Sequence, residues 1–282
     1  MSELTVEQRD LMRDNVPEQD LGQDLKKRPY IPVGDEVDVF TAAWQSGLPV
    51  MLKGPTGCGK TRLVEHMAHQ FGVPLFTVCC HEDMTSSDLL GRFVLRDSST
   101  EWVDGPLTQA VRQGGICYLD EVVEARQDAI VAVHSLADHR RELNIERLGG
   151  LKLQAAEGFQ LVVSYNPGYQ SVLKDLKMST RQRLVGIDLG FPPPDVERKI
   201  LLQESGLDSN VLDDIIKLGQ AIRRLDDAAL RETASTRALV ATATLVRAGL
   251  RPRAAAVSAI ASPLTDDVET CERLTVLIDS YL

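Results

Sequence analysis

The sequence predicts an α/β protein, a parallel β-sheet sandwiched by helices, with an all-helical lid domain at its C-terminal end. Short, continuously apolar segments alternate with helical stretches up to about residue 192, which is typical of parallel strands covered on both faces. Beyond the proline run at residues 192–194 only helical periodicity remains. With 282 residues, 43% of them hydrophobic, the chain is long enough to bury a core in a large and a smaller domain.

Five apolar segments are the predicted strands, and a short helix precedes them. The helix is expected over residues 35–47, where Val37, Phe40 and Trp44 fall on one face. The strands are expected in the segments 49–53, 74–81, 115–121, 159–167 and 184–192. Residues 1–30 are charged and without periodicity, and we interpret them as a polar N-terminal tail or a docking arm. The α/β domain is therefore expected to span residues 31–192.

The lid domain is expected over residues 193–282. Its first clear helix is marked by apolar residues at alternating intervals of four and three, namely Val211, Ile215, Leu218, Ile222 and Leu225. A second helix is expected in the segment 235–250, with Ser235 and Thr236 as candidate N-cap residues. Two further helical stretches reach the C-terminus.

The segment GPTGCGKT, residues 54–61, has the spacing GxxxxGK[ST] of a phosphate-binding loop, and it stands between a predicted strand and a predicted helix. Glycines let backbone N–H groups approach the phosphates, and the N-terminus of the following helix adds partial positive charge. We expect Lys60 to contact the β- and γ-phosphates of ATP and the Thr61 hydroxyl to ligate Mg²⁺. The expected nucleotide contacts of this segment are Gly54, Pro55, Thr56, Gly57, Cys58, Gly59, Lys60, Thr61 and Arg62.

A pair of carboxylates follows the third predicted strand, in the sequence ICYLDE. Asp120 and Glu121 would lie at the carboxyl edge of the sheet, where ligands bind in open α/β sheets. We expect Asp120 to hold Mg²⁺ through water and Glu121 to act as the general base that polarises the attacking water. A small-molecule kinase would not need Glu121, and the Asn-Lys-x-Asp motif of GTPases does not occur in the sequence. The sequence therefore favours ATP hydrolysis.

With these motifs in place, the order of the remaining elements resembles the AAA+ ATPases of the MoxR branch, a group of P-loop NTPases. Asn166, in SYNPG at the end of the fourth strand, matches the family's first sensor, which orients water against the γ-phosphate. The segment STRQRL follows where the family has its arginine finger, so the resemblance implies Arg183 as the finger and Arg181 as the second choice. Arg237, in STRAL, matches the second-sensor arginine of the lid.

Two inserted segments strengthen the resemblance to the MoxR branch in particular. Residues 89–107 interrupt a helix with two extended pieces, like the helix-two insert of this branch, which faces the central pore of the ring. Residues 141–154 alternate like a hairpin and match the one that the branch places before the first sensor. Phe93 and Trp102 of the first insert are candidates for gripping a target segment; the alternative is that they only pack the insert.

The runs GICYLDEVVEARQD and LVVSYNPGYQ are similar to the CbbQ/NorQ group, and the resemblance covers nearly the whole chain from residue 34. It implies a homohexameric ring that uses ATP to remodel a target, with a partner protein that carries a von Willebrand factor A domain. CbbQ proteins act with CbbO to reactivate inhibited Rubisco, which makes Rubisco the first expected target. NorQ proteins support assembly of nitric-oxide reductase, which is the alternative. A ring that binds ATP as a switch, with little turnover, is a third possibility.

Composition bears on partners and location. The net charge is −10, and so acidic a protein is not expected to bind nucleic acid or an anionic membrane. No apolar run is long enough to span a bilayer and the N-terminal segment does not resemble a signal peptide, so we expect a cytoplasmic protein. The cysteines number five, which favours free thiols. Adjacent Cys79 and Cys80 should point to opposite faces of a strand and not share a metal ion.

Overall fold

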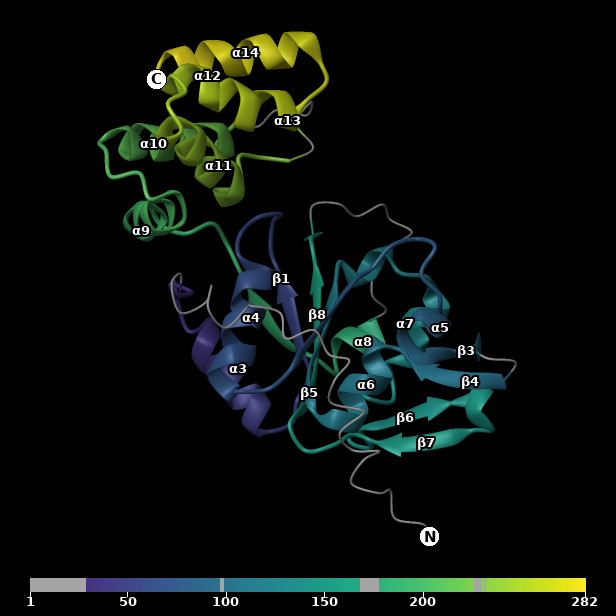
Figure 1. Cartoon of the computed structure of the whole chain (residues 1–282). Coiled ribbons are helices and arrows are strands. Elements are labelled where there is room, and N and C mark those ends of the chain that lie inside the picture. The colour runs from purple at the N-terminus through teal and green to yellow at the C-terminus, as the bar shows by residue number, and fades with distance from the viewer. Residues whose placement is uncertain (1–28, 97–98, 168–177, 226–229, 231) are drawn as a thin grey trace.

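A parallel sheet of five strands forms the centre of the computed structural model, which describes residues 29–96, 99–167, 178–225, 230 and 232–282. The strands lie in the order β2-β5-β8-β1-β9, and every neighbouring pair is parallel (Figure 1). They are β1 (Val50–Lys53), β2 (Leu75–Cys79), β5 (Gly115–Asp120), β8 (Phe159–Tyr165) and β9 (Val185–Asp188). All five strands expected from the sequence are present.

Helices cover both faces of this sheet, because successive residues of a strand point to opposite sides. The helices of this α/β body are α3 (Glu36–Gln45), α4 (Lys60–Phe71), α5 (Ser86–Leu90), α6 (Pro106–Gln113), α7 (Gln127–Ala132) and α8 (Met178–Arg181). Val50 and Leu52 share a buried cluster with side chains of α3 and α4. Met51, between them, belongs to the cluster formed with α6 and α7. The helix expected near residue 40 is α3, in which Phe40 is fully buried.

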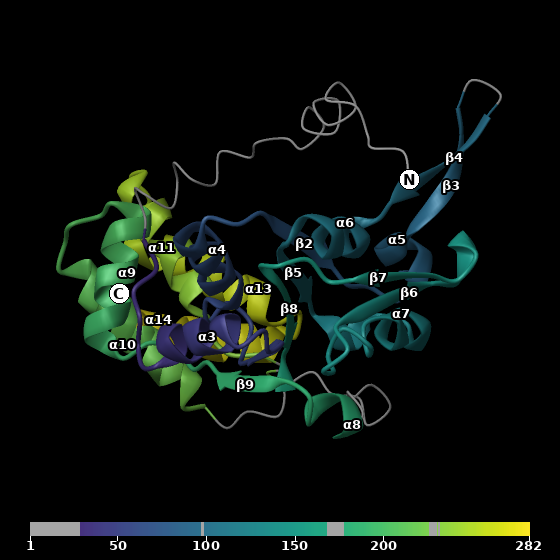
Figure 2. The same ribbon diagram turned by 90° about the horizontal axis from the view of Figure 1, so that it is seen from below.

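Two hairpins project from the body on the side away from α3 (Figure 2). The first pairs β3 (Gly91–Arg96) with β4 (Ser99–Asp104), and the second pairs β6 (Glu142–Ile145) with β7 (Leu151–Gln154). A short 3₁₀ turn, η2 (Glu146–Leu148), joins β6 to β7. These are the extended pieces that the sequence predicts in the segments 89–107 and 141–154.

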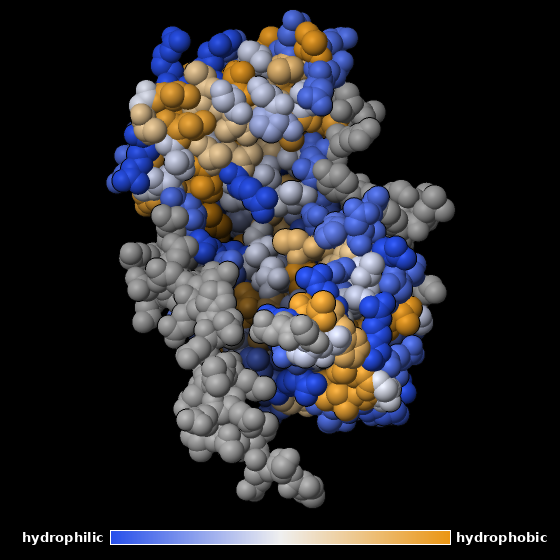
Figure 3. All heavy atoms as spheres, turned by 45° about the vertical axis from the view of Figure 1, so that its right-hand side comes forward, coloured by the Kyte–Doolittle hydropathy of each residue, from blue (hydrophilic) through white to orange (hydrophobic). Residues whose placement is uncertain are grey.

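The first hairpin carries exposed apolar side chains. Phe93 and Trp102 are cross-strand partners whose rings meet edge to face, with centroids 5.1 Å apart. Trp102 is half-buried and its Nε1 donates to Asp104 at 2.7 Å, so this ring packs the hairpin. Phe93 and Leu95, in contrast, are 51% and 74% exposed. Figure 3 looks at this side of the molecule, and hydrophobic side chains gather on it among charged ones.

The C-terminal helices pack into a separate core above the edge at which β1 and β8 end (Figure 1). They are α9 (Pro194–Ser205), α10 (Val211–Arg223), α11 (Thr236–Arg247), α12 (Pro252–Ala256), a π-helical turn η4 (Val257–Ala261), α13 (Ser262–Leu264) and α14 (Val268–Asp279). Leu212, Ile215 and Leu239 are among their fully buried side chains. Within the described residues, every helix is too short or too polar to cross a membrane.

Two details of the lid helices differ from what the spacing of apolar residues and the cap candidates predicted. Leu225 was expected to continue the apolar face of α10, but the helix ends at Arg223 and Leu225 is 45% exposed. The cause is a tighter last turn, in which the Leu225 N–H bonds the carbonyl of Ile222, three residues back, and turns Leu225 off the buried face. At α11, Ser235 is the N-cap and accepts from the N–H of Ala238, whereas Thr236 is the first helical residue.

Candidate nucleotide-binding site

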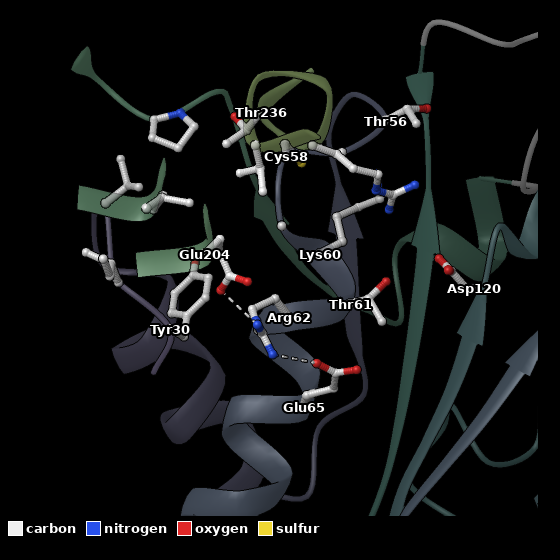
Figure 4. Close-up of a pocket in the computed structure, with 18 of the residues that line it drawn as sticks. Tyr30, Thr56, Cys58, Lys60, Thr61, Arg62, Glu65, Asp120, Glu204 and Thr236 are labelled. Carbon is white, nitrogen blue, oxygen red and sulfur yellow. Dashed lines mark hydrogen bonds and ion pairs between the residues drawn. The ribbon is translucent and has the colours of Figure 1, made fainter. Parts of the chain in front are cut away.

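A cavity of about 490 Å³ lies between the body and the lid, where β2 and β5 end (Figure 4). The body lines the cavity with residues 56–62, with Cys79, Cys80, Asp120 and Glu121, and with the segment before α3. The lid and its linker line it with Pro192, Ile200, Gln203, Glu204, Thr236, Arg237 and Val240. Both halves of the sequence motif for nucleotide hydrolysis therefore meet in one cavity.

Glycines shape the loop because neighbouring groups leave no room for side chains. A Cβ atom on Gly54 would collide with the carbonyl oxygen of Leu189. One on Gly57, which has a φ of +69°, would lie 2.7 Å from the Cβ atom of Ser235 in the lid. Gly59 then precedes Lys60, where α4 begins. The loop thus closes on the N-terminus of α4, which favours a bound anion.

Lys60 places a positive charge inside the curve of this loop. Its side chain is only 9% exposed, and Nζ donates hydrogen bonds to the carbonyl oxygens of Gly54 at 2.8 Å and Pro55 at 3.0 Å. The neighbouring Cys58 is also buried, and burial raises the pKa of its thiol against the lowering effect of Lys60. The thiol therefore stays neutral and adds no negative charge to the loop, whose N–H groups and ammonium group favour a phosphate.

The acidic pair lies at the end of β5, where Asp120 is the last residue of the strand and Glu121 follows it; both line the cavity. Asp120 is partly buried, and its carbonyl accepts the N–H of Cys80 at 2.9 Å. Glu121 is exposed and has a φ of 55°, in the left-handed region. For a residue with a side chain this conformation costs about 1–2 kcal/mol, and such outliers cluster at functional sites. The strained turn carries Glu121 out of the sheet and into the cavity lining.

The donor set fits Mg²⁺. The Thr61 hydroxyl lies 3.4 Å from the hydroxyl of Tyr118, which in turn donates to Asp120. Mg²⁺ prefers oxygen ligands and is usually held by one or two carboxylates together with substrate phosphates. Within the described part of the chain, no three His, Cys, Asp or Glu side chains form a metal-binding group by themselves. Cys79 is exposed and Cys80 is buried, as expected from adjacent strand residues.

Of the two sensor candidates, Arg237 lines this cavity, whereas Asn166 contacts it through the lining residue Thr56. Asn166 directly follows β8 and is 9% exposed, and its Nδ2 donates to the Thr56 hydroxyl at 2.8 Å and to Glu232 of the lid at 3.5 Å. Arg237 lies in the first turn of α11 and lines the cavity from the lid side. One body residue and one lid residue therefore approach the phosphate loop from two directions.

The two finger candidates lie elsewhere. Arg181 donates to the hydroxyl of Tyr165, and its guanidinium lies 5.2 Å from the centre of that ring. Arg183 is exposed in the turn between α8 and β9. Neither lines the cavity of its own chain.

Contacts across the mouth of the cavity tie the lid to the body. Arg62 of α4 donates to Glu204 of α9 at 2.9 Å, and a second ion pair joins it to Glu65 at 3.6 Å (Figure 4). Gln203 donates to the carbonyl of Pro29 at 2.9 Å. Arg62 was expected from the sequence to contact the nucleotide. In the structure it also forms an ion pair with the lid.

Comparison with known families separates the same two regions. Residues 49–184 match the AAA domain family of the dynein-related subfamily. Residues 197–281 match the family described as CbbQ/NirQ/NorQ C-terminal. The chain belongs to the CbbQ/NirQ/NorQ family of AAA+ ATPases. The resemblance seen in the sequence motifs is thereby confirmed, and so is ATPase as the enzyme class.

Relatives within this family carry three different names. The chain is 54% identical to the denitrification regulatory protein NirQ of Stutzerimonas stutzeri, over 87% of this chain and 89% of that protein. It is 54% identical to protein NorQ of Paracoccus denitrificans, covering 85% and 88% of the two chains. Protein CbbQ of Hydrogenophilus thermoluteolus is 50% identical, with 86% and 91% covered. A solved structure of a RuvB variant from Thermotoga maritima shares the fold, with a TM-score of 0.53, 14% identity, and 92% of this chain and 70% of that chain covered.

One part of this CbbQ/NirQ/NorQ chain's site escaped the sequence analysis. Tyr30, placed in the tail from its composition, lines the cavity together with Pro29. Its hydroxyl donates to Glu36 at 2.8 Å, and Glu36 also accepts the N–H groups of Val33 and Gly34, each at 2.8 Å. Although burial opposes it, these hydrogen bonds lower the pKa of Glu36. An ionised, 5% exposed carboxylate therefore anchors the segment along the cavity.

Proposed function

We propose that this chain is the ATP-hydrolysing subunit of a hexameric ring that remodels a client protein. One observation carries the proposal: Lys60, Thr61, Asp120 and Glu121 line a single cavity that the lid completes with Arg237. A site that only bound nucleotide as a switch would not need the strained placement of Glu121.

Each of these residues has a specific role in the proposed reaction. Lys60 and the N–H groups of the loop hold the β- and γ-phosphates. Thr61 and Asp120 would hold Mg²⁺, which neutralises charge on the phosphates. Glu121 takes the proton of the attacking water, and Asn166 orients that water. Its hydrogen bond to Thr56 supports this role, because it keeps the amide beside the phosphate loop.

The apolar part of the cavity suits the adenine base. Ile31 of the body and Ile200 and Val240 of the lid line it, beside the side chain of Tyr30. Because this wall is built from both parts of the chain, bound ATP would contact lid and body together.

The position of the arginines supports a ring. Stabilising the charge of phosphoryl transfer usually requires an arginine near the γ-phosphate, supplied in cis or in trans. Arg183 is exposed and outside its own cavity, which supports its action on the ATP of a neighbouring subunit. Arg181 remains second, because it already contacts Tyr165.

A subunit-mixing experiment tests the ring. Glu121→Gln subunits and Arg183→Ala subunits should each hydrolyse ATP slowly alone. Mixed rings should regain turnover, because some interfaces then combine an intact Glu121 with an intact Arg183. Failure to regain activity, or full activity of a monomeric wild-type chain, would contradict the shared site. Lys60→Ala, which should not bind ATP, controls for activity from contaminating enzymes.

The proposed ring also needs a client, the protein that it remodels. The sequence analysis placed Rubisco first and nitric-oxide reductase second, each with a partner that carries a von Willebrand factor A domain. Identities of 54% to NirQ and NorQ proteins, against 50% to a CbbQ protein, support the opposite order. We therefore place a denitrification enzyme first and inhibited Rubisco second. The test adds this chain, its cognate partner and ATP to each inactive client. Recovery of Rubisco alone would reverse the order.

A further inference from the structure

Two buried hydroxyl groups bind the acidic pair, and neither was expected from the sequence. Tyr118 on β5 and Ser164 on β8 are both fully buried, on neighbouring strands. The Tyr118 hydroxyl donates to Oδ1 of Asp120 at 2.6 Å, and the Ser164 hydroxyl donates to the same oxygen at 2.5 Å. Since each hydroxyl has one hydrogen, both are committed to this carboxylate.

This pattern fixes the orientation of Asp120. Both hydrogen bonds end on Oδ1, so Oδ2 keeps its lone pairs for a ligand in the cavity that Asp120 lines. The hydrogen of Tyr118 is already used, so at 3.4 Å the Thr61 hydroxyl is the donor to Tyr118.

Ser164 also reaches the second acid. While its hydrogen goes to Asp120, its Oγ accepts the N–H of Glu121 at 3.0 Å. Glu121 is the residue in the left-handed conformation, at the turn between β5 and the 3₁₀ turn η1 (Val122–Glu124). Such a conformation persists only where surrounding contacts hold it. One side chain on β8 thus contacts both acids at the end of β5.

We propose that Ser164 is a positioning residue that fixes Asp120 and Glu121 in one relative orientation, so that the carboxylate that would bind Mg²⁺ and the general base face the same ATP. The proposal rests on the proposed ATP hydrolysis at this cavity. Tyr118 is the natural comparison, because its hydroxyl donates to Asp120 alone of the two acids, whereas Ser164 contacts both.

The test compares Ser164→Ala with Tyr118→Phe in the full chain, measuring ATP turnover across a range of Mg²⁺ concentrations. Both variants should raise the half-saturating Mg²⁺ concentration. Only Ser164→Ala should also lower kcat at saturating Mg²⁺, and outer partners of metal ligands typically change affinity or activity roughly 10- to 100-fold. A fluorescent ATP analogue without Mg²⁺ should bind all variants equally, because the phosphate loop is intact.

Ser205→Ala is the matched control. Ser205 is 2% exposed, donates to the carbonyl of Leu201 and accepts the N–H of Leu207, but does not line the cavity. It should keep the wild-type kcat and Mg²⁺ dependence. If Ser164→Ala does not fold, Ser164→Cys replaces it, since a thiol of similar shape is only a weak donor.

Failure of the positioning role and failure of the proposed ATP hydrolysis give different outcomes. Unchanged kcat and Mg²⁺ dependence in Ser164→Ala or Ser164→Cys would overturn the positioning role. Loss of analogue binding without Mg²⁺ would also overturn it, because it would show a general structural defect. A wild-type ring without ATP turnover would instead refute the proposed function.

Discussion

A buried ion pair in the lid is expected to hold the edge of the nucleotide cavity, and Arg223→Met tests this. Glu197 of α9 is fully buried and accepts hydrogen bonds from Arg223 of α10 at 2.9 and 2.7 Å. Glu197 also accepts the hydroxyl of Thr236 at 2.7 Å, and Thr236 lines the cavity. The guanidinium of Arg223 further lies 4.0 Å from the ring centre of Phe191 in the linker.

The magnitude follows from what the substitution leaves behind. Glu197 would remain without solvent and with a single neutral donor, Thr236. Removing one partner of a buried ion pair costs about 3–5 kcal/mol. The Nε bond from Arg223 to the carbonyl of Ala234, 2.7 Å long, would also be lost, whereas methionine can keep apolar contact with Phe191. At an m-value of about 2 kcal/mol per M, the urea midpoint of the lid should fall by roughly 2 M.

Urea unfolding followed by circular dichroism measures this shift, and two variants sharpen it. Glu197→Leu combined with Arg223→Met should recover most of the stability, because apolar pairs of similar volume often replace buried ion pairs without loss. Arg253→Met breaks an exposed ion pair with Asp279 in the same lid and should change the midpoint little. The reasoning is refuted if Arg223→Met unfolds at the wild-type midpoint, or if Arg253→Met is equally destabilised.

Three further predictions concern the cavity. Glu121→Gln should bind ATP normally but release phosphate at least about 100-fold more slowly, and wild-type turnover would remove Glu121 from the base role. Arg62→Ala should release nucleotide faster, as measured by stopped-flow fluorescence. Its free energy of unfolding should change by less than about 1 kcal/mol, because the ion pair with Glu204 is partly exposed. An unchanged release rate would contradict a role of this lid contact in holding nucleotide. Iodoacetamide should alkylate exposed Cys79 before Cys80, whose burial beside Asp120 raises its pKa to about 12 and keeps the thiolate scarce until alkaline pH. ATP should protect Cys79, and mass spectrometry showing Cys80 modified first would contradict the assignment.

Features that depend on neighbours in sequence were predictable. The five strands are continuous apolar runs, and the phosphate loop and the Asp120–Glu121 pair are short motifs whose spacing the chemistry dictates. The cap at Ser235 followed from its position before an apolar helix. Leu225 shows the limit of periodicity, since the pattern of spacing does not reveal where the last turn of a helix tightens.

Features that depend on contacts between residues far apart in the sequence could not be predicted. Arg62 and Glu204 are 142 positions apart in the sequence, and nothing local indicates that α9 returns to α4. Tyr30 lies beside a charged stretch that composition assigns to a tail, and only its contact with buried Glu36 places it at the cavity. Ser164 did leave a signal: it is a polar residue inside the otherwise apolar run LVVSY, which usually means that a buried partner exists.

The ATP site lies apart from the exposed hairpins, so it does not identify the proposed client. Lys60, Thr61, Asp120 and Glu121 line the cavity under the lid, while the hairpins β3–β4 and β6–β7 project from the other side of the body (Figure 2). Relatives with three different names share at least 50% identity with this chain. Phe93 and Leu95 lie on the same face of their hairpin and are exposed, and hydrolysis of ATP gives neither residue a role. The proposed choice of client is therefore tested by reactivation assays with the proposed partner present, because an ATPase rate reports only on the cavity.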